Sequence, residues 1–382
     1  MPPRLSIVLA SLLGFHSIGC EKVPTFQELT GQDANKNSVP VVNSATPTVT
    51  PEKAALEVVP VSPPNIEDPA AIIAALSTKS GKQTDQEIAS ASKVTSVIAG
   101  LKSLNVSQSS VTDEGVRLFG QFSAVMQVDL SGLQIDGAGI EGLQPLANLR
   151  ELAMVSVKLG SSTGWGHLGK LSQVETLNLT SSNITDADVS ALVTMTGLKE
   201  LNISYTSLTD AALVHLAKLE NLETLRMEGT VKMNGVGLKS FVEKKPMSGL
   251  RCLYASFTPL SREGLSSVKK IGSLEVFENN AVQLTDQLIS ELKGATNLKT
   301  LAVSQNKLTT ASGLTFRTMR NLENLDLSQN ITVNTPVLAS LAPLTDLNTL
   351  NVTKTNCSVS AVLDFRRLRK KCKVIFDDNP SQ

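Results

Sequence analysis

The feature that most constrains this chain is a hydrophobic pattern that returns about every 24 residues. In this pattern, LxxLxL, leucine or another apolar residue usually fills positions 1, 4 and 6. It begins eleven times: at Leu101, Val125, Leu149, Val174, Leu198, Leu222, Leu250, Leu274, Leu298, Leu322 and Leu347. The steps are 24 or 25 residues, except for one of 28, and we expect a partial twelfth start at Cys372. Such repeats bury their apolar residues only against their neighbours, so the chain is predicted to stack into a solenoid.

Each repeat combines two periodicities. Alternation in LxxLxL places positions 4 and 6 on one face of a strand and positions 3, 5 and 7 on the other. Positions 16, 19 and 22 then follow helical spacing, as in Leu213, Leu216 and Leu219. An apolar residue and Thr-Asp often lie between them, as in 208–210. The Thr is predicted to cap the helix, and the Asp to lie at the positive end of the helix dipole.

Composition divides the chain into segments. Residues 101–382 hold 46 of the 53 Leu, whereas ten of the 16 Pro lie at or before Pro69. Residues 21–66 show no hydrophobic period and are predicted to be a flexible Pro/Ser/Thr-rich tether. Residues 67–100 are predicted to be an N-terminal cap, 101–371 the eleven repeats, and 372–382 a C-terminal strand and tail. Within the cap, a helix is expected over 68–78, with Asp68 as its N-cap.

Residues 1–20 have the features of an export signal. Arg4 precedes an apolar run from Leu5 to Ile18, which is too short to span about 30 Å of hydrocarbon. The run ends in Ser-Ile-Gly-Cys at 17–20, which resembles a bacterial lipobox, although Ser17 stands where Leu is usual. That resemblance implies lipidation of Cys20; the alternative is an ordinary cleaved signal. No later segment is apolar over 18 residues, so no transmembrane helix is expected.

The repeats also resemble a known family. The segments LKELNISYTSLTDAALVHLAKL and LKTLAVSQNKLTTASG resemble leucine-rich repeats, and the resemblance covers about residues 101–377. It is strongest to the bacterial exported lipoprotein type with LTDxxLxxL repeats, within the ribonuclease-inhibitor-like superfamily. The resemblance implies an α/β fold: a right-handed solenoid, or horseshoe, with parallel strands on the concave face and helices on the convex face. Departures are Asn279 at core position 6, the missing Thr-Asp after Leu222, and an irregular loop in 149–173.

No pattern for catalysis, a cofactor or a metal is found. His167 and His215 lie in predicted convex segments and have no neighbours that would complete a nucleophile–base pair or a metal site. Residues 164–169 match GxGxxG, but they belong to the apolar pattern of a repeat, without the βαβ unit of a dinucleotide site. The chain has 35 basic and 35 acidic residues, so it lacks the basic excess of a nucleic-acid-binding protein.

The C-terminal end carries cysteines and a basic cluster. Cys357 and Cys372 fall at core positions and are predicted to be buried thiols; the alternative in an oxidising compartment is a disulfide. The cluster consists of Arg366, Arg367, Arg369, Lys370, Lys371 and Lys373. We interpret it as a solvated cap, and the alternative is contact with anionic lipid headgroups.

The concave face is the predicted binding surface. Most position 5 residues are small and polar, but the middle repeats carry Arg226, Tyr254 and Glu278. Tyr205 and Phe257 fall nearby at position 8, and Glu228 at position 7. Because Arg and aromatic residues dominate binding hot spots, the predicted partner-binding residues are Tyr205, Arg226, Glu228, Tyr254, Phe257 and Glu278.

The same face is predicted to be acidic. Positions 3, 5 and 7 hold one cation, Arg226, and six carboxylates: Asp129, Glu151, Glu200, Glu228, Glu278 and Asp326. Charge complementarity therefore favours a basic partner surface.

These observations favour a non-catalytic, monomeric binding scaffold that recognises a protein or peptide on its concave face. Its location would be the bacterial cell envelope, on the periplasmic side or the surface, with Cys20 as its membrane anchor. One alternative is an intracellular adaptor of the ubiquitin-ligase receptor type, which needs an adaptor-binding domain that residues 21–66 do not supply. Another is an enzyme whose site has no recognisable pattern. The identity of the partner and the choice of membrane are not determined by the sequence.

Overall fold

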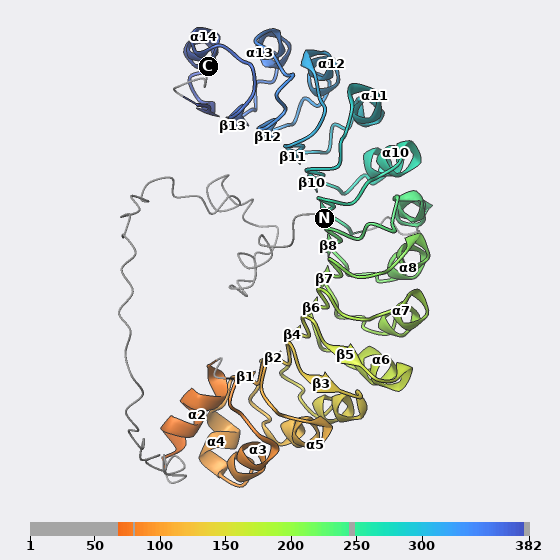
Figure 1. Ribbon diagram of the computed structural model, residues 1–382, viewed down its shortest axis with the longest axis vertical. Coiled ribbons are helices and arrows are strands. Elements are labelled where there is room, and N and C mark those ends of the chain that lie inside the picture. Colours follow the sequence, from red (N-terminus) through yellow and green to blue (C-terminus); the bar gives the residue numbers. More distant parts are fainter. Residues whose placement is uncertain (1–67, 79–80, 244–248, 378–382) are drawn as a thin grey trace, which may run out of the picture. The chain divides into compact units, whose positions relative to one another are not determined.

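The computed structural model describes residues 68–78, 81–243 and 249–377. The predictions for the export signal, Cys20 and the tether concern residues that lie outside these ranges. The described residues form a leucine-rich-repeat solenoid in which strands alternate with helices, as the repeat pattern predicts. Parallel strands line the concave side and helices lie on the convex side (Figure 1).

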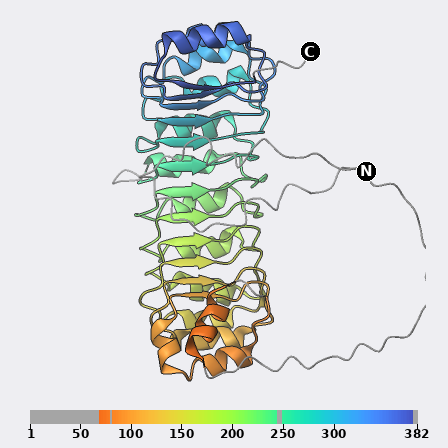
Figure 2. The ribbon, with the colours of Figure 1, turned by 90° about the vertical axis from the view of Figure 1, so that its left-hand side faces the viewer.

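One parallel sheet runs the length of the described residues and has twelve strands. Its order is β1-β2-β4-β6-β7-β8-β9-β10-β11-β12-β13-β14, so each strand pairs with that of the next repeat (Figure 2). These strands are β1 (Ser103–Asn105), β2 (Gln127–Asp129), β4 (Glu151–Ala153), β6 (Thr176–Asn178), β7 (Glu200–Asn202), β8 (Thr224–Arg226), β9 (Cys252–Tyr254), β10 (Val276–Glu278), β11 (Thr300–Ala302), β12 (Asn324–Asp326), β13 (Thr349–Asn351) and β14 (Lys373–Ile375). Two further strands, β3 (Gln134–Ile135) and β5 (Lys158–Leu159), pair separately. Equal repeat positions face each other, which aligns side chains into rows along the concave face.

The convex side holds short α-helices of four to ten residues, because strand and loops take up much of each repeat. The α-helices are α2 (Pro69–Ser77), α3 (Asp85–Ala91), α4 (Thr95–Gly100), α5 (Asp113–Arg117), α6 (Ser162–Gly169), α7 (Asp186–Leu192), α8 (Asp210–Leu216), α9 (Lys239–Glu243), α10 (Arg262–Lys270), α11 (Asp286–Ile289), α12 (Gly313–Phe316), α13 (Pro336–Leu341) and α14 (Val359–Leu368). The 3-10 helices are η1 (Leu118–Gln121), η2 (Ala138–Leu143), η3 (Val236–Leu238), η4 (Ser290–Leu292) and η5 (Thr310–Ser312).

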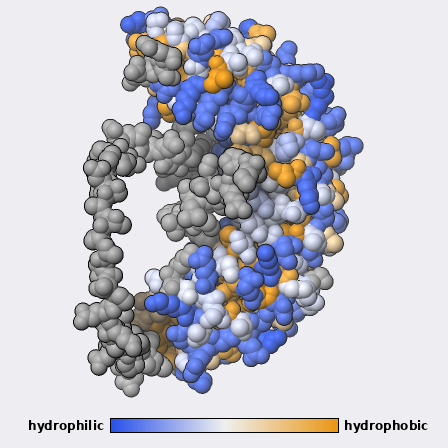
Figure 3. Space-filling view, in the orientation of Figure 1, coloured by the Kyte–Doolittle hydropathy of each residue, from blue (hydrophilic) through white to orange (hydrophobic). Residues whose placement is uncertain are grey.

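The apolar positions of the repeat form one long, thin core. Leu198, Leu201 and Ile203, at positions 1, 4 and 6 of one repeat, are at most 1% exposed. The same cluster continues from Leu76 to Val374. Hydrophilic side chains cover much of the visible convex rim, with hydrophobic patches between them (Figure 3). Each repeat therefore depends on its neighbours for burial.

Buried amides join successive repeats where the core departs from apolar residues. Asn279 is fully buried, and its Nδ2 donates to the carbonyls of Ala255 (2.7 Å) and Thr258 (3.1 Å) in the preceding repeat. At position 9 of the next repeat, Asn306 donates to the carbonyl of Asn279 (3.0 Å), and its Oδ1 accepts from the N–H of Leu284 (2.9 Å). Because these bonds satisfy backbone groups at the bends after β9 and β10, the amide groups are tolerated in the core.

The Thr-Asp pairs cap helices and also connect repeats. The Thr209 hydroxyl accepts from the N–H of Ala211, as the predicted N-cap requires. Asp210 accepts hydrogen bonds from the N–H groups of Asn234 (2.8 Å) and Gly237 (2.9 Å) in the following repeat. The Asp is therefore a connection between repeats as well as a favourable charge at the helix start.

Both ends of the solenoid are capped. At the N-terminal end, α2 begins at Pro69 as predicted and packs against α4 and β1. At the other end, β14 pairs with β13 so that Val374 faces Leu350 at position 4. The last repeat thus begins at residue 371, and the expected start at Cys372 is wrong by one residue. A slip of one residue reverses the faces of a strand, and here burial of Val374 decides the register.

Candidate functional site

The central repeats bring three chemically unusual side chains into one row. Pairing of β8, β9 and β10 aligns Arg226, Tyr254 and Glu278 at position 5. The guanidinium carbon of Arg226 lies 3.8 Å from the centre of the Tyr254 ring, which is a cation–π contact. Tyr254 is only 6% exposed, although position 5 was expected to be open. Tyr254 therefore packs against Arg226 and exposes little surface.

Glu228 fixes Arg226 from the neighbouring position. One carboxylate oxygen of Glu228 lies 3.4 Å from Nη1 of Arg226, and the other accepts a hydrogen bond from the hydroxyl of Ser204. The backbone N–H of Glu228 donates in turn to that hydroxyl oxygen, at 3.1 Å. Arg226 is therefore held by a carboxylate and a ring, so its charge is largely engaged within the protein.

Three carboxylates on the concave face, Glu200, Glu278 and Asp326, have raised pKa values. Burial raises the pKa of Glu278 from 4.5 to about 7; the charges of Glu228 and Asp326 add to this effect, and Arg226 opposes it. Burial likewise raises the pKa of Asp326 from 3.8 to about 6, against a hydrogen bond of 2.8 Å from the N–H of Ser328. Burial also raises the pKa of Glu200. The central face has more desolvated carboxylates than cations to compensate them.

Two exposed aromatic side chains border this row in an unusual backbone conformation. Position 8 has a positive φ in every one of the eleven repeats, and most repeats place a small or polar residue there. Tyr205 (φ 58°) and Phe257 (φ 61°) are each 49% exposed. Bulky residues adopt this conformation at an energetic cost. Both rings remain about half exposed despite this cost, so these positions are candidates for binding.

Gly229 separates the two rings and has φ 66° at the same position. A Cβ atom on Gly229 would lie 2.5 Å from two carbons of the Tyr205 ring, so that ring lies directly over the glycine. The pKa of the Tyr205 hydroxyl is raised by burial and by the charge of Glu228. We name Tyr205, Arg226, Glu228, Tyr254, Phe257 and Glu278 the central patch. Their role in partner binding remains a prediction.

A charged row at position 2 was not predicted from the sequence. Arg and Lys alternate with Glu from repeat to repeat at the start of the strands. Salt bridges join Arg150–Glu175 (3.4 Å), Lys199–Glu175 (2.7 Å), Arg251–Glu223 (4.0 Å), Arg251–Glu275 (3.2 Å) and Lys299–Glu275 (3.3 Å). The alternation is visible in the sequence once position 2 is followed along the repeats. These Arg and Lys side chains pair with Glu side chains of the same row. They therefore compensate little of the negative charge at positions 3, 5 and 7.

The remaining chemical candidates have structural roles. Within 164–169, Trp165 and Leu168 are buried in the core, as expected for part of a repeat helix. Cys357 and Cys372 are both free, so no disulfide joins them. Cys372 is buried as predicted, whereas Cys357 is only partly buried. Burial raises the pKa of both thiols, that of Cys372 to about 11. In the described part of the chain, His, Cys, Asp and Glu side chains form no group of three or more that could hold a metal ion. None of the described helices is long and apolar enough to cross a membrane.

Comparison with known proteins identifies the repeat class. Residues 172–231 match the family model described as leucine rich repeat, and the solenoid as a whole has the leucine-rich-repeat fold. Among solved structures, an internalin (inlF) from Listeria monocytogenes is 19% identical, with a TM-score of 0.50 over 82% of this chain and 95% of that one. A chain of the mouse RP105/MD-1 complex is 13% identical, with a TM-score of 0.50 over 78% of this chain and 58% of that one. Among curated proteins, no sequence matches significantly. These similarities define the fold.

Proposed function

We propose that this protein is a non-catalytic binding scaffold that recognises a basic segment of a protein or peptide on its central patch. The observation that carries the proposal is the imbalance of charge there. Glu278 is desolvated enough to raise its pKa to about 7, while the nearby cation, Arg226, is already held by Glu228 and Tyr254. A Lys or Arg from a partner would supply the missing compensation.

The aromatic residues provide the second part of the proposed contact. Tyr205 and Phe257 offer half-exposed rings on either side of Gly229, which follows Glu228 in the chain. Aromatic side chains bury a large area at small entropic cost and are enriched among binding hot spots. A basic residue could lay its aliphatic stem on a ring and pair its charge with a carboxylate.

A peptide library tests this proposal while the partner is unidentified. Phage-displayed 12-residue peptides would be selected on the purified protein, and the affinities of selected peptides measured by calorimetry. We expect enrichment of Lys and Arg, and a loss of about 30-fold in affinity for the double variant Tyr205→Ser and Phe257→Ser. The matched control is Gln305→Ser with Gln329→Ser, at position 8 of other repeats with φ of 54° and 59°. Peptides without basic residues, or equal losses in both variants, would contradict the proposal.

The affinity should also depend on pH. A bound cation favours the ionised form of Glu278, whose pKa is about 7 when the site is empty. Binding therefore requires loss of a proton at low pH, and affinity should rise by about tenfold from pH 6 to pH 8. Glu278→Gln should bind more weakly at pH 8 and show a flatter profile. If the affinity of wild type and of Glu278→Gln depended on pH in the same way, Glu278 would not be part of the binding site.

We further propose that the protein is exported and anchored in the bacterial envelope through Cys20. The support is the signal-like segment ending in Ser-Ile-Gly-Cys and the Pro-rich segment that follows it. Fractionation of cells that express wild type, Cys20→Ala or Cys357→Ala tests this. We expect Cys20→Ala alone to leave the membrane fraction and to lose labelling by radioactive palmitate. A wild type found in the cytosol would instead favour the intracellular adaptor.

A further inference from the structure

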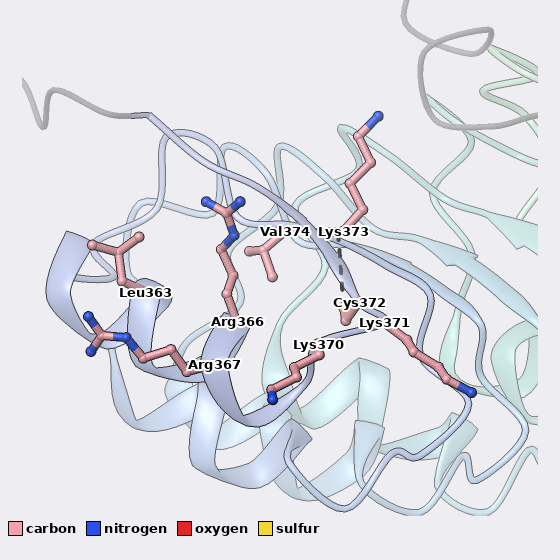
Figure 4. Close-up of a pocket in the computed structure, with 8 residues that line it drawn as sticks. All are labelled: Leu363, Arg366, Arg367, Lys370, Lys371, Cys372, Lys373 and Val374. Carbon is pink, nitrogen blue, oxygen red and sulfur yellow. Dashed lines mark hydrogen bonds between the residues drawn. The ribbon is translucent and has the colours of Figure 1, made fainter.

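The C-terminal end of the solenoid has a second surface with a different charge. A hollow of about 740 Å³ lies between α14 and the last strand, and its lining includes Leu363, Arg366, Arg367, Lys370 and Lys371. Figure 4 shows the cationic side chains fanning outward around the hollow and not turning toward one another. We name these five residues, with Leu368, the basic end.

This end is strongly positive in a chain with a formal net charge of zero. Residues 359–377 contain six cations (Arg366, Arg367, Arg369, Lys370, Lys371, Lys373) and two carboxylates (Asp364, Asp377), so six minus two leaves a net charge of +4. The carboxylates are already engaged: Asp364 pairs with Arg367 at 2.7 Å, and Asp377 accepts from the N–H of Lys354 at 2.7 Å. Neither of these two carboxylates therefore pairs with Arg366, Lys370 or Lys371.

Capping accounts for only part of the cluster. Arg369 donates to the carbonyls of Ala342 (3.3 Å) and Leu344, which satisfies backbone groups of the preceding repeat. Among the described residues, no carboxylate lies within salt-bridge distance of Arg366, Lys370 or Lys371. These three cations are exposed, and Figure 4 shows their side chains extending outward.

Apolar side chains are exposed among the same cations. Leu363 is 38% exposed and Leu368 is 67% exposed, both on α14. A terminal repeat needs a polar outer face for solubility, so exposed leucines are unfavourable in a simple cap. Leucine mixed with Lys and Arg on one short helix is instead typical of segments that lie at a membrane surface. In such segments, the cations pair with lipid headgroups while the leucines enter the boundary of the acyl chains.

We infer that the basic end is a docking surface for a membrane that contains anionic lipid. This inference is independent of the proposed peptide site, because residues 205–278 and 363–371 belong to different repeats. Contact through this end would leave the central patch accessible to a partner. The attraction is expected to fall with salt, since it depends on several surface charges.

Vesicle binding tests the inference. The probe is vesicles of phosphatidylglycerol and phosphatidylcholine, compared with phosphatidylcholine alone, and the protein is the unlipidated chain 21–382, which retains all described elements. We expect sedimentation with the anionic vesicles only, and at least about tenfold weaker binding for Arg366→Glu with Lys370→Glu and Lys371→Glu. The matched control reverses three exposed lysines elsewhere, Lys218→Glu, Lys269→Glu and Lys270→Glu, and should change binding much less.

Several outcomes would overturn the inference. They are equal binding to both vesicle types, equal losses in the two triple variants, or displacement by millimolar inorganic phosphate, which would indicate a site for a soluble anion. The milder variant Leu363→Ser with Leu368→Ser retains all charges and should still weaken binding by several-fold if acyl contact occurs. Should the charge-reversed protein fail to fold, Lys370→Gln with Lys371→Gln gives the same comparison. Peptide selection in solution is unaffected by any of these results, so the two proposals fail separately.

Discussion

Replacing Glu278 by Gln should change how the stability of the protein depends on pH. Burial raises the pKa of Glu278 from 4.5 to about 7 in the folded protein, whereas the unfolded chain retains the ordinary value. Between these pH values the folded state binds more protons than the unfolded state, so the free energy of unfolding falls as pH rises. The protonated carboxyl contributes its full stability below about pH 4.5, and the contribution is lost above about pH 7. Gln does not titrate and should remove this dependence.

The magnitude follows from the same values. A change in carboxyl pKa from 4.5 to about 7 corresponds to about 3 kcal/mol, at about 1.4 kcal/mol for each pH unit. Most of this difference develops between pH 5 and pH 8. Relative to wild type, Glu278→Gln should therefore gain about 2 to 3 kcal/mol in its free energy of unfolding over that interval.

Urea unfolding at pH 5 and pH 8, followed by circular dichroism, measures the effect. The control is Glu220→Gln, an exposed carboxyl outside the central patch. The quantity to compare is the stability difference between variant and wild type at each pH, which cancels titration elsewhere in the chain. A difference that is the same at both pH values would refute the argument that burial of Glu278 is uncompensated.

Three further substitutions test contacts between repeats. Gly229→Ala should destabilise the protein by about 1–2 kcal/mol and displace the Tyr205 ring, because φ is positive and the ring occupies the Cβ position. Urea unfolding would detect the loss of stability and tyrosine fluorescence the displaced ring, and an unchanged unfolding midpoint would contradict the prediction. Asp210→Ala should lower the free energy of unfolding by about 1–3 kcal/mol and speed amide hydrogen exchange in the next repeat, where two N–H groups lose their acceptor. Unaltered exchange in that repeat would refute the role of Asp210 as a connection between repeats. Glu275→Gln should lower the free energy of unfolding by about 1 kcal/mol in dilute buffer and hardly at all in about 1 M NaCl, because it breaks two partly exposed salt bridges. A loss of stability that persists in salt would indicate a packing effect.

Some features of the central patch could be predicted from the sequence, and others required the structure. Arg226, Tyr254 and Glu278 could be aligned from the sequence, because a fixed repeat period assigns each residue a position in a row of strands. Their environments could not be predicted in the same way. Burial of Tyr254 under Arg226, and the raised pKa of Glu278, depend on side chains from neighbouring repeats that no local pattern specifies.

The sequence by itself determined the repeat solenoid and the row in which each concave residue lies, because apolar spacing within 24 residues dictates which side chains must be buried. Tertiary structure decided which interactions join the repeats. Asp210 bonds to the next repeat, the buried Asn279 amide donates to carbonyls of the preceding repeat, and burial of Val374 sets the register of the last strand, one residue away from the expected start at Cys372. The physical reason is that periodicity is a property of one repeat, whereas hydrogen bonds and desolvation arise between repeats. They depend on distances that only the stacked solenoid fixes.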